Sequence, residues 1–114
     1  MKKNVIDDCD LKYVLDIISD KWSVFVILTL SEKKVVRFNE LQKLLKGISQ
    51  KMLTASLRKL EGNKLVERRV FGEIPPKVEY TLSSIGLSLV PHIKNVVEWA
   101  VNNVDEIKSV DHNL

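Results

Sequence analysis

Hydrophobic residues recur at helical spacing in four consecutive stretches of the chain. Residues 9–19 and 20–32 are rich in leucine, isoleucine and valine, and the second stretch is the more apolar of the two. Residues 37–47 and 49–62 place leucines on one face and polar side chains on the other. Apolar residues that return every three or four positions predict helices. We therefore expect four helices, the second of them buried, although its β-branched residues are also compatible with a strand.

Residues that begin or end helices sharpen these boundaries. Ser19 or Asp20 precedes the second stretch and Ser49 precedes the fourth, and such side chains commonly accept a hydrogen bond from the first turn of a helix. Gly47 is placed to end the third helix. The third and fourth helices are then separated by a very short turn, which is typical of a helix-turn-helix.

The hydrophobic period changes from 3.6 to 2 after Gly62 and Asn63. Residues 65–71 and 77–82 alternate between apolar and polar side chains, and the loop between them holds a glycine and two prolines. Proline cannot donate to a strand ladder, so these residues predict a turn. The two runs are therefore expected to form a β-hairpin, which is the wing of a winged helix.

A last helix is predicted to begin after Ser83 or Ser84 and to run to about Ser109, with Pro91 kinking it or delaying its regular part. Its long apolar stripe indicates either deep packing or, beside the apolar first helix, self-association. The predicted fold is mainly α with a small β-hairpin. We expect residues 1–114 to form one winged helix-turn-helix domain that dimerises through its first and last helices.

Composition excludes several classes of protein. Hydrophobic residues make up 45% of the chain and charged residues 29%, which is typical of a globular protein. No apolar run reaches the length of about 18 residues that a membrane helix needs, and the N-terminus lacks the apolar core of a signal peptide. The single cysteine, Cys9, cannot form a disulfide within the chain, which fits a cytoplasmic protein.

Basic residues are concentrated in the middle of the chain. Between Lys33 and Lys77 there are 12 Lys or Arg and 4 Asp or Glu, whereas the remainder has 6 basic and 11 acidic residues, giving the net charge of +3. A basic segment between acidic flanks favours a polyanionic partner. A solvated charged face is the alternative that charge alone leaves open.

The polar face of the fourth helix gives this charge a role. Arg and Lys can bind guanine in the DNA major groove, Gln can bridge adenine, and alanine permits close approach or contact with a thymine methyl. Cations on the hairpin and at the start of the third helix could bind phosphates. The candidate DNA-binding residues are Arg37, Asn39, Ser49, Gln50, Lys51, Thr54, Ala55, Arg58, Arg68, Arg69 and Lys77.

From Cys9 to Trp99 the chain resembles the HxlR-type winged helix-turn-helix transcriptional regulators of bacteria and archaea. The resemblance rests on DKWSVFVILTL, RFNELQKLLKGISQKMLTASLRKLE, LVERRVFGEIPPKVEYTLSSIG and the closing VEW. It implies a homodimer whose first and last helices form much of the interface and whose recognition helices meet adjacent half-sites. Family members often have proline where this chain has Asp10 and glycine where it has Asp20; the second difference concerns helix capping.

Cys9 is similar to the family cysteine that serves as a thiol sensor in some members. A nearby helix N-terminus favours the thiolate, but Asp7, Asp8 and Asp10 oppose it. An intersubunit disulfide or an adduct with a small thiol would be its reversible product. The alternative is an inert, partly buried cysteine.

Other residues that could carry chemistry favour structural roles. Trp22 and Trp99 are expected in the core or in an interface, and Phe71 and Tyr80 are expected to support the wing. No Cys or His spacing matches a metal site, and no constellation suits catalysis, so neither metal nor cofactor is expected.

These observations predict a cytoplasmic, sequence-specific transcription regulator that binds double-stranded DNA as a homodimer, with an oxidant or a small molecule as its candidate effector. The alternative is a winged helix whose basic face binds an acidic protein instead of a specific DNA site.

Overall fold

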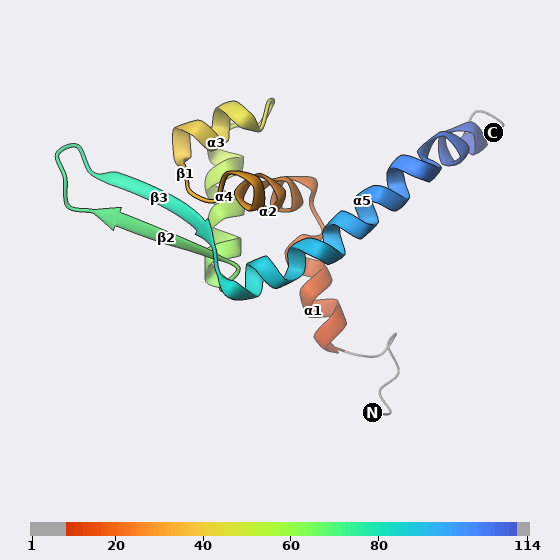
Figure 1. The fold of residues 1–114 in the computed structure, drawn as a ribbon, viewed down its shortest axis with the longest axis horizontal. Coiled ribbons are helices and arrows are strands. Elements are labelled where there is room, and N and C mark those ends of the chain that lie inside the picture. The colour runs from red at the N-terminus through yellow and green to blue at the C-terminus, as the bar shows by residue number, and fades with distance from the viewer. Residues whose placement is uncertain (1–8, 112–114) are drawn as a thin grey trace.

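The structure is a computed structural model that describes residues 9–111 of the 114-residue chain (Figure 1). Four helices precede a hairpin and a long last helix, in the predicted order. The elements are α1 (Cys9–Ile18), α2 (Lys21–Lys33), β1 (Val36–Arg37), α3 (Phe38–Leu44), α4 (Gln50–Gly62), β2 (Val66–Phe71), β3 (Lys77–Leu82) and α5 (Ser84–Asp111).

Helix α2 lies at the centre of the fold, as its apolar sequence predicts. Its residues Val26, Ile27 and Leu30 are almost completely buried, and α2 packs against α4, α5 and β3. Asp20 is its N-cap and accepts a hydrogen bond from the Ser23 amide at 2.8 Å, which decides between the two predicted caps. The helical interpretation of this segment is confirmed and the strand interpretation is wrong.

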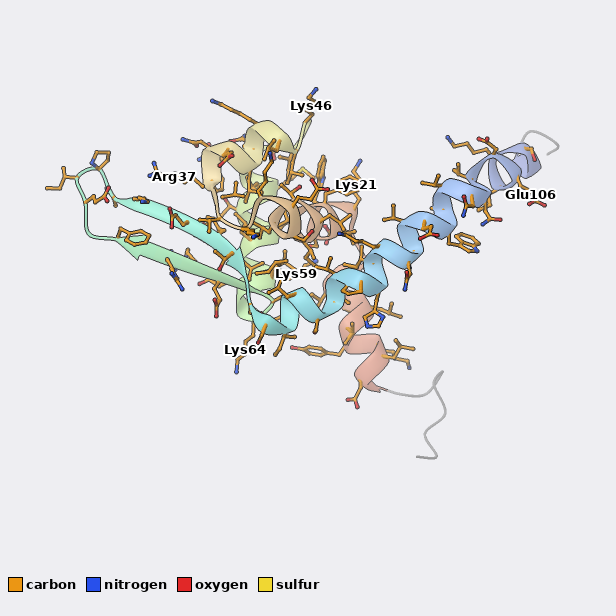
Figure 2. All side chains as sticks on the ribbon, viewed as in Figure 1. Lys21, Arg37, Lys46, Lys59, Lys64 and Glu106 are labelled. Carbon is orange, nitrogen blue, oxygen red and sulfur yellow. The ribbon has the colours of Figure 1, made fainter. Side chains whose placement is uncertain are left out.

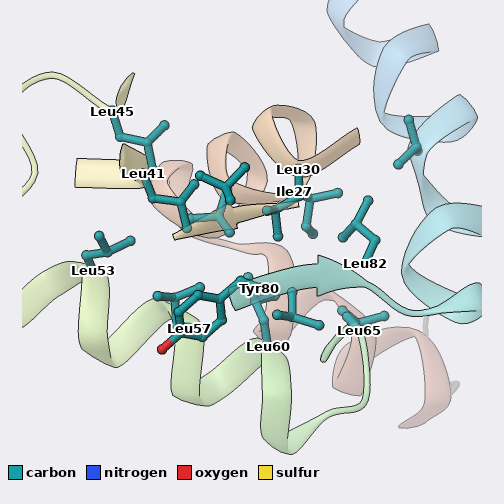
Figure 3. Close-up of a cluster of buried hydrophobic side chains, with 14 of the residues drawn as sticks. Ile27, Leu30, Leu41, Leu45, Leu53, Leu57, Leu60, Leu65, Tyr80 and Leu82 are labelled. Atoms are coloured by element: carbon teal, nitrogen blue, oxygen red, sulfur yellow. The ribbon is translucent and has the colours of Figure 1, made fainter. Parts of the chain in front are cut away.

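The leucines of α3 and α4 complete the core between the helices and the sheet. Leu41 of α3 and Leu53, Leu57 and Leu60 of α4 face α2 and β3 in the cluster that Figure 3 shows. Ser49 caps α4 by accepting a hydrogen bond from the Met52 amide at 3.1 Å. These contacts hold α4 by one face only and leave its other face at the surface.

The third helix is shorter than its sequence predicts. It ends at Leu44, and Leu45 is buried beyond it. Gly47 lies in the following turn with φ 94°, a left-handed conformation that glycine adopts without the cost a side chain brings. Gly47 therefore shapes the turn to α4 rather than capping the helix itself.

The sheet has one strand more than the sequence predicts. Strand order is β1-β3-β2, all antiparallel, with Val36 opposite Tyr80 and Arg68 opposite Tyr80 on the other side. The added strand β1 is only two residues long, so its sequence has no alternation to detect. It joins the wing, defined here as residues 66–82, to the start of α3.

Only the root of the wing belongs to the core. Val66, Tyr80 and Leu82 are buried, whereas the rest of β2 is exposed. Figure 1 shows the hairpin extending away from the helices. Alternation in β2 therefore predicts the strand correctly, although only its first residue is buried.

Helix α5 begins against the root of the wing and then leaves the body. Ser83 caps it by accepting a hydrogen bond from the Gly86 amide at 3.0 Å. A Cβ atom on Gly86 would lie 2.2 Å from the Leu65 carbonyl oxygen, so the helix can approach this closely only with glycine there. The helix is already regular seven residues before Pro91 and runs through it, so the predicted delay is wrong.

Candidate nucleic-acid interface

Helix α4 presents a polar face that is separate from its leucines. Four of the side chains on this reading face are exposed and Thr54 is half-buried. We define the reading face as Gln50, Lys51, Thr54, Ala55 and Arg58, all predicted from the sequence, and these residues line one shallow surface depression. The face lies opposite the buried Leu53, Leu57 and Leu60, so the core fixes its direction.

Two hydroxyl groups on this helix already make intramolecular hydrogen bonds. Thr54 Oγ1 donates to the Gln50 carbonyl oxygen at 2.8 Å, and the Ser49 hydroxyl oxygen accepts the capping bond described above. Each group therefore keeps only part of its hydrogen-bonding capacity for a ligand. Ser49 has a structural role that the sequence also predicts.

The two cations of the reading face are uncommitted. Within residues 9–111, neither Lys51 nor Arg58 has a carboxylate oxygen within 4.0 Å. A cation without a local partner is available to phosphates or to guanine acceptors.

The cations of the wing are mostly paired, which the sequence reasoning missed. Arg68 Nε lies 3.3 Å from the Glu61 carboxylate of α4. Lys77 Nζ lies 3.4 Å from Glu79 Oε2 and 4.8 Å from the centre of the Phe71 ring. Lys77 and Glu79 are two residues apart in a strand and so share a face, which means that their ion pair could have been predicted from the sequence. The Glu61–Arg68 pair could not, because it depends on how α4 and β2 pack together.

Arg69 is the wing cation without such a partner in the described part of the chain. It is exposed and lies opposite Glu79 across the ladder. Arg37 of β1 lies opposite Glu79 on the other edge of β3. The backbone register therefore places Arg37, Glu79 and Arg69 in one row across the sheet.

Arg37 and Asn39 are exposed at the start of α3, as predicted, and Figure 2 shows Arg37 beside that helix. The sheet therefore connects the predicted phosphate contacts of α3 with those of the wing.

A groove joins the reading face to the wing. The groove is lined by Gln50, Thr54, Leu57, Arg58 and Glu61 of α4, by Arg68, Val78 and Tyr80 of the wing, and by Phe38 of α3. Burial raises the pKa of the Tyr80 hydroxyl above its usual value, while the nearby Arg68 and Arg58 act against that shift and Glu61 adds to it. Helix and wing thus form one continuous surface.

A salt bridge beside the reading face, one helical turn beyond Ala55, connects α4 to α2. Lys59 Nζ lies 2.5 Å from Asp20 Oδ2. Burial raises the pKa of the Asp20 carboxyl, but hydrogen bonds from Lys59 and Ser23 outweigh burial, and the pKa is below its ordinary value. Asp20 therefore caps one helix and positions the other, and the sequence predicted only the cap.

The fold and this surface agree with a known family. The family model for the HxlR-like helix-turn-helix matches residues 17–108, which is most of the chain. This chain belongs to the HxlR-like helix-turn-helix family.

Relatives of this HxlR-family protein are transcription regulators. The HTH-type transcriptional regulator YybR of Bacillus subtilis (strain 168) is 36% identical over 115 residues, covering 98% of this chain and 91% of YybR. The structure of the redox regulator HypR in its reduced form is similar, with a TM-score of 0.81 and 36% identity, covering 88% of this chain and 98% of HypR. The reduced form of the transcriptional regulator YodB from B. subtilis has a TM-score of 0.73 and 33% identity, covering 82% of this chain and 90% of YodB.

Two further observations concern the described residues of this HxlR-family protein. None of its helices there is long and apolar enough to cross a membrane, and no three His, Cys, Asp or Glu side chains there are grouped to hold a metal ion. Cys9 is the first residue of α1, and its side chain lies outside those described.

Proposed function

We propose that this protein is a homodimeric regulator that binds operator DNA with α4 in the major groove. The observation that carries the proposal is the reading face. A helix fixed by buried leucines presents an amide and two cations at its surface, and neither cation has a carboxylate partner among residues 9–111. The core determines the direction of these side chains before DNA arrives, so little ordering is required on binding.

Phosphate contacts would fix the register of this helix on the duplex. Arg37 and Asn39 at the start of α3 and Arg69 on the wing are exposed on either side of α4. Such contacts hold a protein on DNA without reading sequence. Arg68 and Lys77 would contribute less than the sequence suggested, because each already has a carboxylate partner.

The apolar arms of the molecule support the homodimer. Leu11, Val14 and Leu15 of α1 are exposed, as are many large apolar residues of α5: Val96, Val97, Trp99, Val101 and Ile107. Exposed apolar side chains that are grouped on one element commonly mark protein interfaces. Trp99 would then contact the second copy, whereas Trp22 packs against the core of its own chain.

The likeness to HypR, which is described as a redox regulator, supports an oxidant as effector. In this chain the signal would act at Cys9, and its reversible product would be a disulfide with the partner chain or with a small thiol. Mass spectrometry after mild oxidation, paired with DNA binding by the Cys9→Ser variant, tests this. An unmodified Cys9 with unchanged DNA binding would leave the inert cysteine as the answer.

The experiment for the function as a whole is a footprint on the DNA beside the protein's own gene. A two-fold dimer should protect a palindromic site with half-site centres about 10 base pairs apart, and sedimentation should show a dimer at micromolar concentration. Equal, weak affinity for every duplex would contradict sequence-specific regulation and favour the protein-binding alternative.

A further inference from the structure

The loop that joins β2 to β3 carries an apolar tip that the core does not use. Ile74 is 101% exposed, which is complete exposure, and Pro75 and Pro76 beside it are exposed as well. Val70 and Phe71, in the strand that leads to the loop, are exposed too. Figure 1 shows this loop at the far end of the hairpin, away from every helix. Val70 and Phe71 are consecutive in β2 and so point to opposite faces of the hairpin, and the exposed Glu73 precedes Ile74. The apolar part of the tip is therefore Ile74 with Pro75 and Pro76, which the core does not explain.

The wing is rooted beside the reading face. The Glu61–Arg68 ion pair at 3.3 Å joins β2 to α4, and the groove described above is continuous from Arg58 to Val78. Any duplex that fills the reading face therefore also lies against the root of the wing. The tip lies beyond this groove on the same hairpin, and Figure 1 shows the hairpin loop far from α1 and from the outer part of α5.

The length of the wing suits a particular part of the duplex. Each wing strand has six residues, which corresponds to roughly 20 Å at the usual rise per residue. On B-DNA the centre of the minor groove lies half a turn, or about 17 Å, from the centre of the adjacent major groove. With α4 in the major groove, the wing is therefore long enough to reach the neighbouring minor groove.

The chemistry of the tip suits insertion better than base reading. A minor groove about 6 Å wide is bordered by phosphates, which Arg69 and Lys77 on the strands could approach. Ile74 offers no hydrogen bond, so it cannot distinguish bases by their edges. Isoleucine and proline are instead among the residues that enter between base pairs in the minor groove, partly unstack them and bend the duplex.

We propose that Ile74, supported by Pro75 and Pro76, inserts as an apolar wedge into the minor groove beside the sequence that α4 reads, and bends the DNA. The proposal rests on the proposed function, because it requires α4 in the major groove. It adds an activity, DNA deformation, and a source of specificity, since pyrimidine–purine steps unstack most readily.

The test uses the full-length protein and a duplex that the wild type selects from a random library. Dyes at the two ends report bending by energy transfer, and 2-aminopurine placed in the flanks reports unstacking. We expect the wild type to bend the duplex and raise 2-aminopurine fluorescence in a flank. Ile74→Leu should keep both effects, and Ile74→Ala should lose both. The affinity of Ile74→Ala for the duplex should fall by less than about tenfold. The variant loses the contacts of the isoleucine, but it also avoids the free-energy cost of unstacking the base pairs.

A matched control and a charge variant separate the wedge from other effects. Ile85 is also exposed but lies at the start of α5, so Ile85→Ala should bend DNA like the wild type. Ile74→Lys should bind duplexes of any sequence more tightly and still fail to bend them. Circular dichroism checks that each variant is folded.

The two proposals fail in different ways. If the wild type selects no duplex at all, the regulator proposal fails first. If it selects a duplex that stays straight, or if Ile74→Ala bends that duplex as the wild type does, the wedge is overturned and the tip is left as a surface for another protein.

Discussion

Helix α4 and the wing each carry three Lys or Arg residues, yet these cations are held differently. Lys51 and Arg58 on α4 have no carboxylate partner in the described part of the chain, whereas Arg68 and Lys77 on the wing each have one. Counting only the cations makes the two regions look equivalent, although the wing also holds Glu67, Glu73 and Glu79 and has no net charge. The arrangement of their partners makes α4 the region that is open to DNA.

The difference follows from what each element packs against. Helix α4 uses its leucines for the core and leaves the polar face alone, whereas β2 lies against α4 through a polar contact between Arg68 and Glu61. An exposed ion pair of this kind contributes little to stability. Its larger consequence is that it orients the wing relative to the reading face and removes one cation from competition for phosphate.

The largest effect should come from the unpaired cations of α4. Replacing Arg58 by alanine should weaken operator binding by roughly 1–3 kcal/mol if its guanidinium contacts a base, with the fold intact because the side chain is exposed. Fluorescence anisotropy with the operator and with a scrambled duplex measures the loss and the loss of discrimination. Lys94→Ala, an exposed cation on α5, is the control. Equal affinity of Arg58→Ala and wild type would remove α4 from the role of reader.

Much of the fold was predictable because the hydrophobic pattern of most elements extends over many residues. The leucines of α4, the cap at Ser49 and the alternation in residues 77–82 each indicate the structure that forms. Strand β1 was missed because two residues carry no period, and α3 was predicted too long because Leu45, buried beyond the helix, continues its apolar pattern.

The exposure of the candidate DNA-binding residues was predictable from the sequence, but their ion pairs were not. Every predicted DNA-binding residue is exposed or half-buried at the surface, as the patterns required. The partners Glu61 and Asp20 were missed because Arg68 and Lys59 meet them only after distant segments pack together. Exposure can be inferred from a local period, whereas pairing depends on tertiary register.

A smaller effect should separate the wing cations from one another. Arg69→Ala should reduce the slope of log affinity against log salt by about 1, because Arg69 has no carboxylate partner in the described part of the chain and can neutralise a phosphate. Arg68→Ala should change that slope less, since its charge is already balanced by Glu61. Titrations at several salt concentrations measure both slopes, and equal slopes for the two variants would show that the ion pair does not withhold Arg68.

Glu61→Gln provides the converse of that comparison. Without the carboxylate, Arg68 becomes available, so binding to non-operator DNA should strengthen and its salt slope should steepen by up to about 1. The double variant with Arg68→Ala should lose this gain. A gain that survives in the double variant would instead reflect the general removal of a negative charge from the surface.

The smallest effect concerns Lys59, the cation beside the reading face. Asp20→Asn keeps an oxygen that can cap α2 but removes the charge that pairs with Lys59. Both side chains are about a third or more exposed, at 33% for Lys59 and 42% for Asp20, so the loss of unfolding free energy at neutral pH should be below about 1 kcal/mol.

The pH dependence of that loss identifies its cause. Because the folded state lowers the pKa of Asp20 from 3.8, the charge stabilises the fold above that value, and the stabilisation disappears as pH falls through the lower folded-state pKa. Urea unfolding of wild type and Asp20→Asn should therefore differ at neutral pH and converge in acid. Asp16→Asn, which replaces an exposed aspartate of α1, is the control for the loss of one negative charge. A difference in unfolding free energy that persists unchanged in acid would mean that altered capping of α2, and not the lost charge opposite Lys59, destabilises the variant.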